Sequence, residues 1–277
     1  MLPALGSSRS DTEYQNIFAT NFADGKLKSE FAERSIGIFA QQSDIKGRCG
    51  IDGGGGHGRH ILTLASAVGP TGKVISYEPV ARNVSIILNN IRTHLLPRQL
   101  DGIVDLRQKA IGNINGPVDF YEVMESTGLS GLVDGASNRF TKNRFQIDCV
   151  RLDDDIDLEA QRRVGFIKLD LEGGELDAMR GALQIIKGTR PIIAFENGRR
   201  STARLYNYSK EQFFSFFDGI DYSLYCNLGL PLSGDDWDRE SSSMPSDYLA
   251  LPYERAEAFL EKCHPLQVAL LQELTHV

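Results

Sequence analysis

Apolar and polar positions along this chain follow two periods in turn, and their alternation predicts strands followed by helices. Short apolar runs typical of buried strands precede segments in which apolar residues recur at helical spacing. The expected strands cover residues 49–52, 73–78, 103–110, 164–170, 190–196, 222–227 and 247–251. The expected helices follow residue 58, begin at 79, and cover 173–187 and 210–217. This alternation predicts an α/β fold with a seven-stranded, mostly parallel sheet and helices on both faces.

Three regions are expected along the chain. Residues 1–46 predict an N-terminal helical cap, in which apolar positions over 13–42 suit two short helices. Residues 47–252 form the main domain. Residues 253–277 have helical periodicity and predict a tail that packs on the domain or on a partner subunit, so a homo-oligomer is possible.

An insertion is expected between the third and fourth long strands. Residues 117–123 alternate enough to form one strand of a hairpin, and 144–150 form a further short strand. The stretch 126–143 between them is rich in Ser, Gly and Asn, which predicts a mobile loop.

Length, charge and cysteine content narrow the class of protein. A chain of 277 residues and 30.7 kDa has room for one large domain with a modest extension. A net charge of −7 gives no electrostatic reason to bind a polyphosphate, so nucleic acid is not an expected partner. The N-terminus lacks a secretory signal and no window approaches about 18 apolar residues, which predicts a cytoplasmic protein without membrane insertion. The four cysteines are too widely spaced for a C-x-x-C pair and are expected to be reduced packing residues.

A run of glycines follows the first expected strand and opens the first helix. Gly53, Gly55 and Gly58 match the spacing G-x-G-x-x-G, and Glu78 stands 20 residues later, at the end of the next strand. Glycines allow close approach of a ligand, a helix N-terminus offers free N–H groups, and a carboxylate can accept two hydrogen bonds from a ribose. Together they predict an adenosine-type ligand. The alternative is a tight turn with a solvated Glu78.

Two ligands share this geometry, a nicotinamide dinucleotide and S-adenosylmethionine. Asp52 stands directly before the glycines, where its carboxylate would repel a pyrophosphate but tolerate the ammonium of S-adenosylmethionine. Asp52 therefore favours S-adenosylmethionine. The alternative is a structural anchor that accepts hydrogen bonds from loop N–H groups.

A distinctive series of blocks runs along the chain: IDGGGGHG (51–58), GKVISYEP (72–79), KAIG (109–112), RLDD (151–154), IKLDLEGGE (167–175) and PIIAFE (191–196). The series resembles the FkbM family of S-adenosylmethionine-dependent methyltransferases, and residues 247–252 resemble that family's closing strand. The resemblance implies a class I methyltransferase fold, which is Rossmann-like, with its last strand antiparallel. It also implies methyl transfer, usually to a hydroxyl oxygen.

The resemblance assigns individual residues to the site. It places cofactor contacts on the glycine loop, on the acid that binds the ribose at the end of the second strand, in the block KAIG (109–112) and at the end of the fourth long strand. This cofactor-binding set is Asp52, Gly54, Gly55, Gly56, Gly58, Glu78, Ala110 and Asp170. The family's acidic signature beside the active site matches Asp170, Glu172, Gly173 and Glu175, and Ser130 stands where the family tends to carry two serines.

The chain also departs from the family pattern. Gly53, Gly55 and Gly56 replace an aliphatic residue, a small residue and often an asparagine, so a barer loop is expected. One serine of the pair is missing, and the first 46 and last 25 residues have no recognised counterpart. Substrate selection is the property that these departures affect most.

Acidic residues at strand ends are the candidates for the chemistry. Transfer to a hydroxyl needs an in-line approach and a general base, and crowded carboxylates acquire raised pKa values that suit a base. Asp170 and Glu172 are the first candidates for this catalytic role, and Glu196 is the third. The alternative is that Glu172 and Glu175 cap the following helix. Nothing in the spacing supplies an octahedral Mg²⁺ shell, so no metal is expected.

The remaining polar candidates are assigned ordinary structural roles. His57 and His60 stand beside the cofactor loop; exposed residues of a first helical turn are the favoured interpretation, and contact with substrate or action as a base is the alternative. Arg199 and Arg200 are expected to be a solvated pair, and binding of an anionic acceptor is the alternative. Trp237, in a serine-rich acidic loop, receives no role.

The sequence therefore predicts an S-adenosylmethionine-dependent O-methyltransferase. The expected acceptor is a hydroxyl of a sugar, glycan precursor or secondary metabolite. Two other classes of protein stay open, a nicotinamide-dependent oxidoreductase and a non-catalytic cofactor-binding domain.

Overall fold

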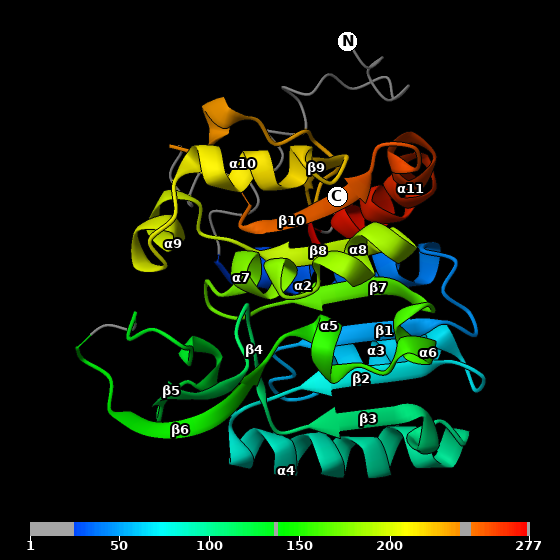
Figure 1. Cartoon of the computed structure of the whole chain (residues 1–277). Helices are drawn as coiled ribbons and strands as arrows, with labels where there is room; N and C mark the ends of the chain where they lie inside the picture. Colours follow the sequence, from blue (N-terminus) through cyan, green and yellow to red (C-terminus); the bar gives the residue numbers. More distant parts are fainter. Residues whose placement is uncertain (1–24, 136–137, 239–244, 276–277) are drawn as a thin grey trace.

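A twisted seven-stranded sheet forms the centre of the molecule. The computed structural model describes residues 25–135, 138–238 and 245–275 (Figure 1). The strand order is β3-β2-β1-β7-β8-β10-β9. In that order the strands are Val104–Arg107, Lys73–Tyr77, Cys49–Gly53, Val164–Leu169, Ile192–Glu196, Asp247–Pro252 and Tyr222–Cys226. Six of these strands run in one direction and β10 runs opposite to them, which confirms the predicted class I methyltransferase fold.

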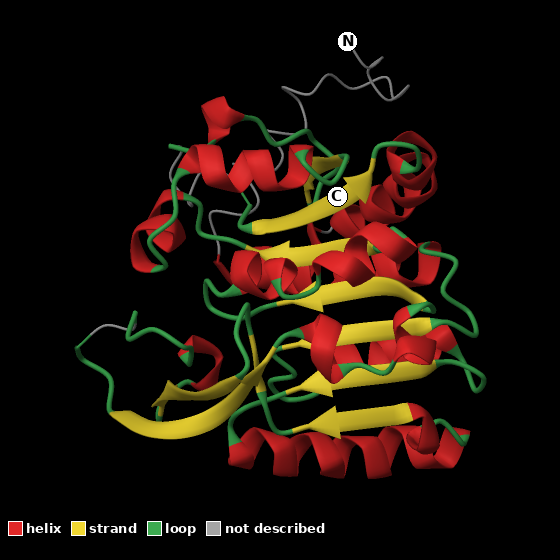
Figure 2. Ribbon diagram, in the orientation of Figure 1, coloured by secondary structure: helices red, strands yellow, loops and turns green. Residues whose placement is uncertain are grey.

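Helices cover both faces of this sheet (Figure 2). One face carries α5 (Leu152–Asp155), α6 (Leu158–Gln161), α7 (Glu175–Arg180), α8 (Leu183–Thr189) and α10 (Lys210–Asp218). The other carries α2 (Gly25–Gln42), α3 (Arg59–Val68), α4 (Ala81–Asn90) and α11 (Ala256–Thr275). A short helix α9 spans Arg200–Leu205, and single helical turns span Ile91–Leu95, Leu96–Arg98, Asp101–Ile103, Thr127–Leu129 and Gly234–Asp236.

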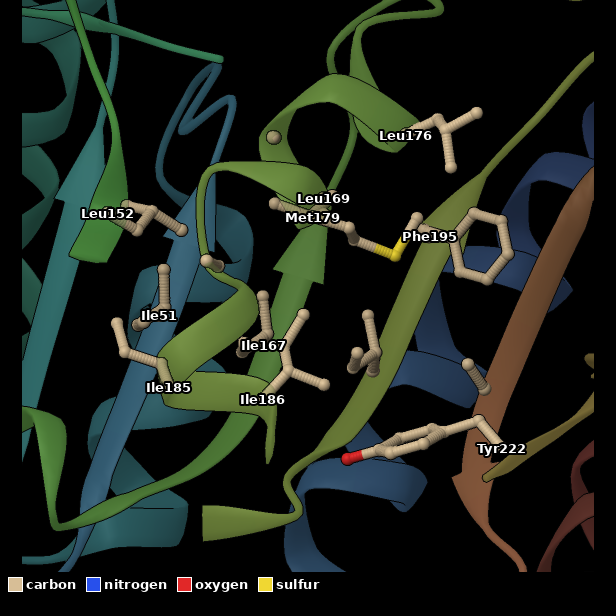
Figure 3. Close-up of a cluster of buried hydrophobic side chains, with 14 of the residues drawn as sticks. Ile51, Leu152, Ile167, Leu169, Leu176, Met179, Ile185, Ile186, Phe195 and Tyr222 are labelled. Carbon is tan, nitrogen blue, oxygen red and sulfur yellow. The ribbon is translucent and has the colours of Figure 1, made fainter. Parts of the chain in front are cut away.

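The core beneath the first set of helices is continuous across the central strands. Ile51 and Ile167 on neighbouring strands lie beside Ile185 and Ile186 on the covering helix α8 (Figure 3). All four are buried, because helices cover the central strands of the sheet on both faces. The ring of Phe195 continues this core under α10. This packing fixes the strand ends that carry the site.

The two terminal regions pack against each other on the opposite face. The rings of Phe39 in α2 and Phe259 in α11 lie 6.3 Å apart. Arg34 donates two hydrogen bonds to the carboxylate of Glu273, each 2.9 Å long. The predicted cap and tail are therefore adjacent, although they lie at opposite ends of the sequence.

A second, three-stranded sheet stands beside the carboxyl edge of the large one (Figure 1). It consists of β4 (Ala110–Ile111), β6 (Lys142–Val150) and β5 (Gly116–Val123). The prediction of a single strand over 103–110 was wrong, because β3 ends at Arg107 and β4 belongs to the small sheet. The backbone N–H of Lys109 donates to the carbonyl of Arg107 (3.0 Å), and this tight turn takes the chain out of the large sheet.

The described helices differ from the predictions at two points, over 173–187 and at α9. The described part of 13–42 is one helix, α2, and residues 13–24 lie outside the described residues. The helix expected over 173–187 is broken into α7 and α8 near Gly181. A Cβ atom at Gly181 would lie 2.0 Å from the carbonyl oxygen of Gly112, so this break allows two backbones to approach. The helix α9 was not predicted, because its sequence lacks an apolar stripe.

The cysteine prediction is confirmed. Cys49, Cys149, Cys226 and Cys263 are all buried and free. Burial raises the pKa of the Cys149 thiol to about 11, which is the behaviour of an inert packing residue. Among the described helices, none combines the length and apolar character needed to cross a membrane.

Candidate functional site

The loop between β1 and α3 brings bare backbone to the carboxyl edge of the sheet. Gly54 (φ 76°), Gly56 (φ 52°) and Gly58 (φ 85°) all have the left-handed conformation that favours glycine. A Cβ at Gly54 would lie 1.9 Å from the carbonyl oxygen of Asp170, and one at Gly55 would lie 2.8 Å from Oγ of Ser76. A Cβ at Gly56 would meet no atom within 4 Å. Gly54 and Gly55 therefore serve close packing, whereas Gly56 leaves open space above the loop.

Glu78 braces this loop from the end of β2. Its Oε2 atom accepts a hydrogen bond from the N–H of Gly56 (2.7 Å), and its Oε1 accepts one from the N–H of Val80 (2.8 Å). The side chain is buried rather than solvated, and burial raises the pKa of its carboxyl. Sequence reasoning missed these backbone contacts. They leave each carboxylate oxygen with lone pairs for a further donor.

Asp52 lies fully buried beneath the loop. Its Oδ2 accepts from the hydroxyl of Ser76 (2.9 Å), and its Oδ1 lies 3.6 Å from Nζ of Lys168 without a hydrogen-bond partner. This position matches the anchor alternative, although the partners are a serine and a lysine rather than loop N–H groups.

Lys168 is a site residue that sequence reasoning missed. Its Nζ donates to the carbonyl of Gly54 (2.9 Å) and lies 3.5 Å from Oδ2 of Asp170. Burial alone would lower the pKa of this amine, but Asp170 and Asp52 raise it overall. The signal in the sequence was a lone cation in an otherwise apolar strand.

Three carboxylates meet at the ends of β7 and β8. One oxygen from each of Asp170, Glu172 and Glu196 lies within 4.8 Å of the other two. Burial, followed by the charge of Asp170, raises the pKa of Glu172 to about 8 and that of Glu196 to about 9. The predicted catalytic acids are therefore brought together. Their oxygens are also ligands of the kind that bind Mg²⁺, although no metal was expected.

Glu175 braces the turn before α7 and does not cap that helix, because the N-cap residue Gly174 has no side-chain capping hydrogen bond. Its Oε1 accepts hydrogen bonds from the N–H groups of Leu171 (2.8 Å) and Gly173 (3.0 Å). Its Oε2 is buried without a hydrogen-bond partner, and burial raises the carboxyl pKa to about 7. Glu172, in contrast, has a left-handed backbone (φ 53°) that turns the chain toward the acidic cluster.

Three cavities adjoin this cluster. The glycine-loop cavity, about 80 Å³, lies beside Glu78 and the small sheet. The α2 cavity, about 180 Å³, lies between helix α2 and the sheet, and the α9 cavity, about 380 Å³, lies beside helix α9. Asp170 lines the first two, Glu172 lines the glycine-loop and α9 cavities, and Glu196 lines the α2 and α9 cavities. The acidic cluster is thus the junction of all three.

The predicted cofactor-binding residues separate into two groups. The glycine-loop cavity is lined by Gly54, Gly56, Glu78, Ala110 and Asp170. Its lining does not include the other three, Asp52, Gly55 and Gly58, which support the loop from below or from the helix side.

Ser130 also lines the glycine-loop cavity. Its hydroxyl oxygen accepts a hydrogen bond from the N–H of Val123 (2.9 Å), which ties the wall of the insertion to β5. The serine therefore shapes the cavity wall.

Some polar residues lie where the sequence did not predict. His57 is exposed as expected, but His60 is buried, and its Nε2 lies 3.0 Å from Oε2 of Glu33 in α2. Arg199 is also buried rather than solvated, because its guanidinium donates to the carbonyl of Pro245 (3.0 Å).

Trp237 is likewise buried, although it stands in an acidic loop. Its ring lies 5.1 Å from that of Phe213 in α10. Long-range aromatic packing of this kind has no local signal in the sequence.

One family model and several solved structures are similar to this chain. Residues 52–223 match the model of the methyltransferase FkbM domain, whereas no curated protein matches the sequence. A methyltransferase FkbM structure from Methylobacillus flagellatus KT is 20% identical, with a TM-score of 0.47, and the match covers 73% of this chain and 43% of that one.

Two further solved structures are similar at lower identity. The O-methyltransferase from Bacillus cereus in complex with SAH is 14% identical (TM-score 0.40, covering 89% of this chain and 93% of that one). The O-methyltransferase TomG from Streptomyces achromogenes in complex with SAM is 12% identical (TM-score 0.43, covering 90% and 92%). Because the family match spans more than half of the sequence, the resemblance predicted from its blocks is confirmed, and this chain belongs to the FkbM methyltransferase family.

Proposed function

We propose that this protein is an S-adenosylmethionine-dependent O-methyltransferase that acts on a hydroxyl of a sugar, glycan precursor or secondary metabolite. Membership of a methyltransferase family supports the reaction class. The observation that carries the cofactor proposal is the open backbone at Gly56, held in place by the carboxylate of Glu78. A loop with free space above a left-handed glycine, beside a buried acid, suits a nucleoside whose ribose approaches closely.

The residues around the glycine-loop cavity suit the parts of this cofactor. Glu78 accepts hydrogen bonds from the ribose hydroxyls with the lone pairs that Gly56 and Val80 leave unused. Ala110 and the neighbouring Ile111, both buried apolar residues, form the wall against the adenine. Asp170 lies at the far end, where the cofactor's positive charge is expected.

The glycine-loop cavity is smaller than the cofactor that we propose it binds. About 80 Å³ is less than the roughly 300 Å³ at which ligand pockets usually begin. The wall opposite Glu78 comes from the insertion, with Phe120 and the short helical turn Thr127–Leu129. We infer that this wall moves outward when the cofactor binds and so enlarges the cavity between Glu78 and Asp170.

The acidic cluster provides the chemistry on the acceptor side. When bound, S-adenosylmethionine supplies the electrophilic methyl group on its sulfonium. Glu172 takes the proton from the acceptor hydroxyl at its carboxylate oxygen, because its raised pKa of about 8 suits a base at neutral pH. Asp170 holds the acceptor in line, and Glu196 completes the acceptor side from β8.

Calorimetry tests the proposal directly. Titration with S-adenosylhomocysteine should give one site per chain, and titration with NAD⁺ should give no binding. Incubation with S-adenosylmethionine and hydroxyl acceptors should then yield methyl ethers. Binding of NAD⁺ alone would contradict the cofactor assignment, and binding of S-adenosylhomocysteine without turnover of any acceptor would point to a non-catalytic domain.

A further inference from the structure

The α2 cavity brings together parts of the chain outside the family match. Helix α2 lies behind the sheet and contributes Glu33, while Asn227 and Asp247 come from the region of β9 and β10 (Figure 1). All three positions fall outside residues 52–223. His60 and Lys168 complete the polar lining.

Two buried polar atoms among the residues lining this cavity have no hydrogen-bond partner. They are Oδ1 of Asn227, whose residue is 3% exposed, and Nδ1 of His60, whose residue is 6% exposed. Buried polar groups are nearly always paired, and an unpaired one costs about 1–3 kcal/mol. The amide oxygen of Asn227 can only accept a hydrogen bond, so the missing partner is a donor.

The charges around the cavity favour a cation as this donor. A hydrogen bond from His60 lowers the pKa of Glu33 to about 2, so this carboxylate is ionised across the working pH range. Asp247 adds a further acid to the lining. The amine of Lys168 is already engaged by the carbonyl of Gly54 and by Asp170, so it is not available to an anion.

We propose that the α2 cavity binds a protonated amino group carried by the methyl acceptor. This inference rests on the proposed methyltransferase function. A volume of about 180 Å³ equals about six water volumes, which suits an amino group with a few attached carbons. Ile36 and Phe39 of α2 provide apolar contacts for those carbons.

The position of the cavity connects the amino group to the reacting hydroxyl. Asp170 and Glu196 line the α2 cavity and also belong to the acidic cluster. An amino group held here places the rest of the acceptor over that cluster. The extension before the family domain then acts as the part of the chain that selects the acceptor.

A matched pair of sugars tests this. The protein is first saturated with S-adenosylhomocysteine and then titrated with glucosamine and with glucose, which has a hydroxyl in place of the amine. We expect glucosamine to bind at least tenfold more tightly. Glu33→Gln keeps the hydrogen-bond acceptor for His60 and removes the charge, so it should reduce this preference about tenfold. Glu30→Gln, the same change one turn earlier on α2, removes a charge that pairs with Arg59 and does not line the cavity, so it should leave the preference unchanged.

The outcomes of these titrations distinguish failure of the amino-group proposal from failure of the proposed function. Equal affinities for the two sugars, or no measurable binding of either, would overturn the proposal while leaving the cofactor assignment intact. If Glu33→Gln weakened S-adenosylhomocysteine and left the sugar preference unchanged, the amine would be that of the cofactor and the proposal would be wrong. Failure of S-adenosylhomocysteine to bind the wild-type protein would instead reject the proposed function.

Discussion

The variant Gly56→Ala distinguishes an effect on cofactor affinity from an effect on the stability of the fold. Its φ of 52° is left-handed, and a Cβ there would meet no protein atom within 4 Å. In Gly56→Ala the only cost to folding is the backbone strain, which is about 1–2 kcal/mol for a residue other than glycine. The added methyl group would occupy the open space proposed for the nucleoside, so we expect the Kd for S-adenosylhomocysteine to rise at least tenfold, or about 1.4 kcal/mol.

Gly229→Ala is the matched control. Gly229 also has a left-handed φ (79°), a Cβ there would make only an ordinary 3.5 Å contact with Leu260, and it lies outside the three cavities. Urea unfolding should show similar losses of stability for both variants, whereas calorimetry should show weaker cofactor binding only for Gly56→Ala. Equal cofactor affinities in the two variants would refute the reasoning that the space above Gly56 holds the nucleoside.

Further predictions concern the acids of the site. Glu78→Ala should weaken S-adenosylhomocysteine binding by about 1–3 kcal/mol, and an unchanged Kd in calorimetry would remove Glu78 from the site. Asp170→Asn and Glu172→Gln should each lower kcat more than they weaken cofactor binding, about a hundredfold for Glu172→Gln; full activity in both would reject the acidic-cluster mechanism. Because the base must be deprotonated, wild-type kcat should rise with pH to a plateau above about 8, and Glu172→Gln should lose this limb. Burial raises the pKa of Glu175 from 4.5 to about 7, so its contribution to stability is full below pH 4.5 and is lost by about pH 7. The unfolding free energy of the wild type should therefore fall between these pH values, and that of Glu175→Gln should fall less steeply. Urea unfolding at several pH values measures both, and the same pH dependence in the two proteins would contradict this. Dialysis against EDTA should leave activity intact, whereas a loss that Mg²⁺ restores would show that Asp170, Glu172 and Glu196 hold a metal.

The sequence predicted the features that depend on local pattern. Buried parallel strands read as short apolar runs, so seven strands in a mostly parallel sheet could be predicted from periodicity and the family blocks. The glycine loop and Glu78 were found because backbone conformation and ligand approach both restrict residue type there. Asp170, Glu172 and Glu196 could be grouped because the carboxyl ends of parallel strands share one edge of the sheet.

What the sequence did not predict depends on contacts between distant segments. His60 is buried only because α2, from the N-terminal extension, places Glu33 beside it. Trp237 is buried by α10, and Arg199 by hydrogen bonds to the chain before β10. Lys168 was overlooked because its role arises from the loop and strand ends around it, which no spacing along the chain records.

The most direct test of the account is a crystal structure of the protein with bound S-adenosylhomocysteine. The account predicts the adenosine across the tips of β1 and β2, with ribose oxygens within about 3.2 Å of the Glu78 carboxylate, the sulfur directed toward Asp170, and the turn Thr127–Leu129 displaced outward. Density for the ligand at any other place, or strand tips that stay closed by Phe120 and Ser130 at saturating ligand, would contradict it.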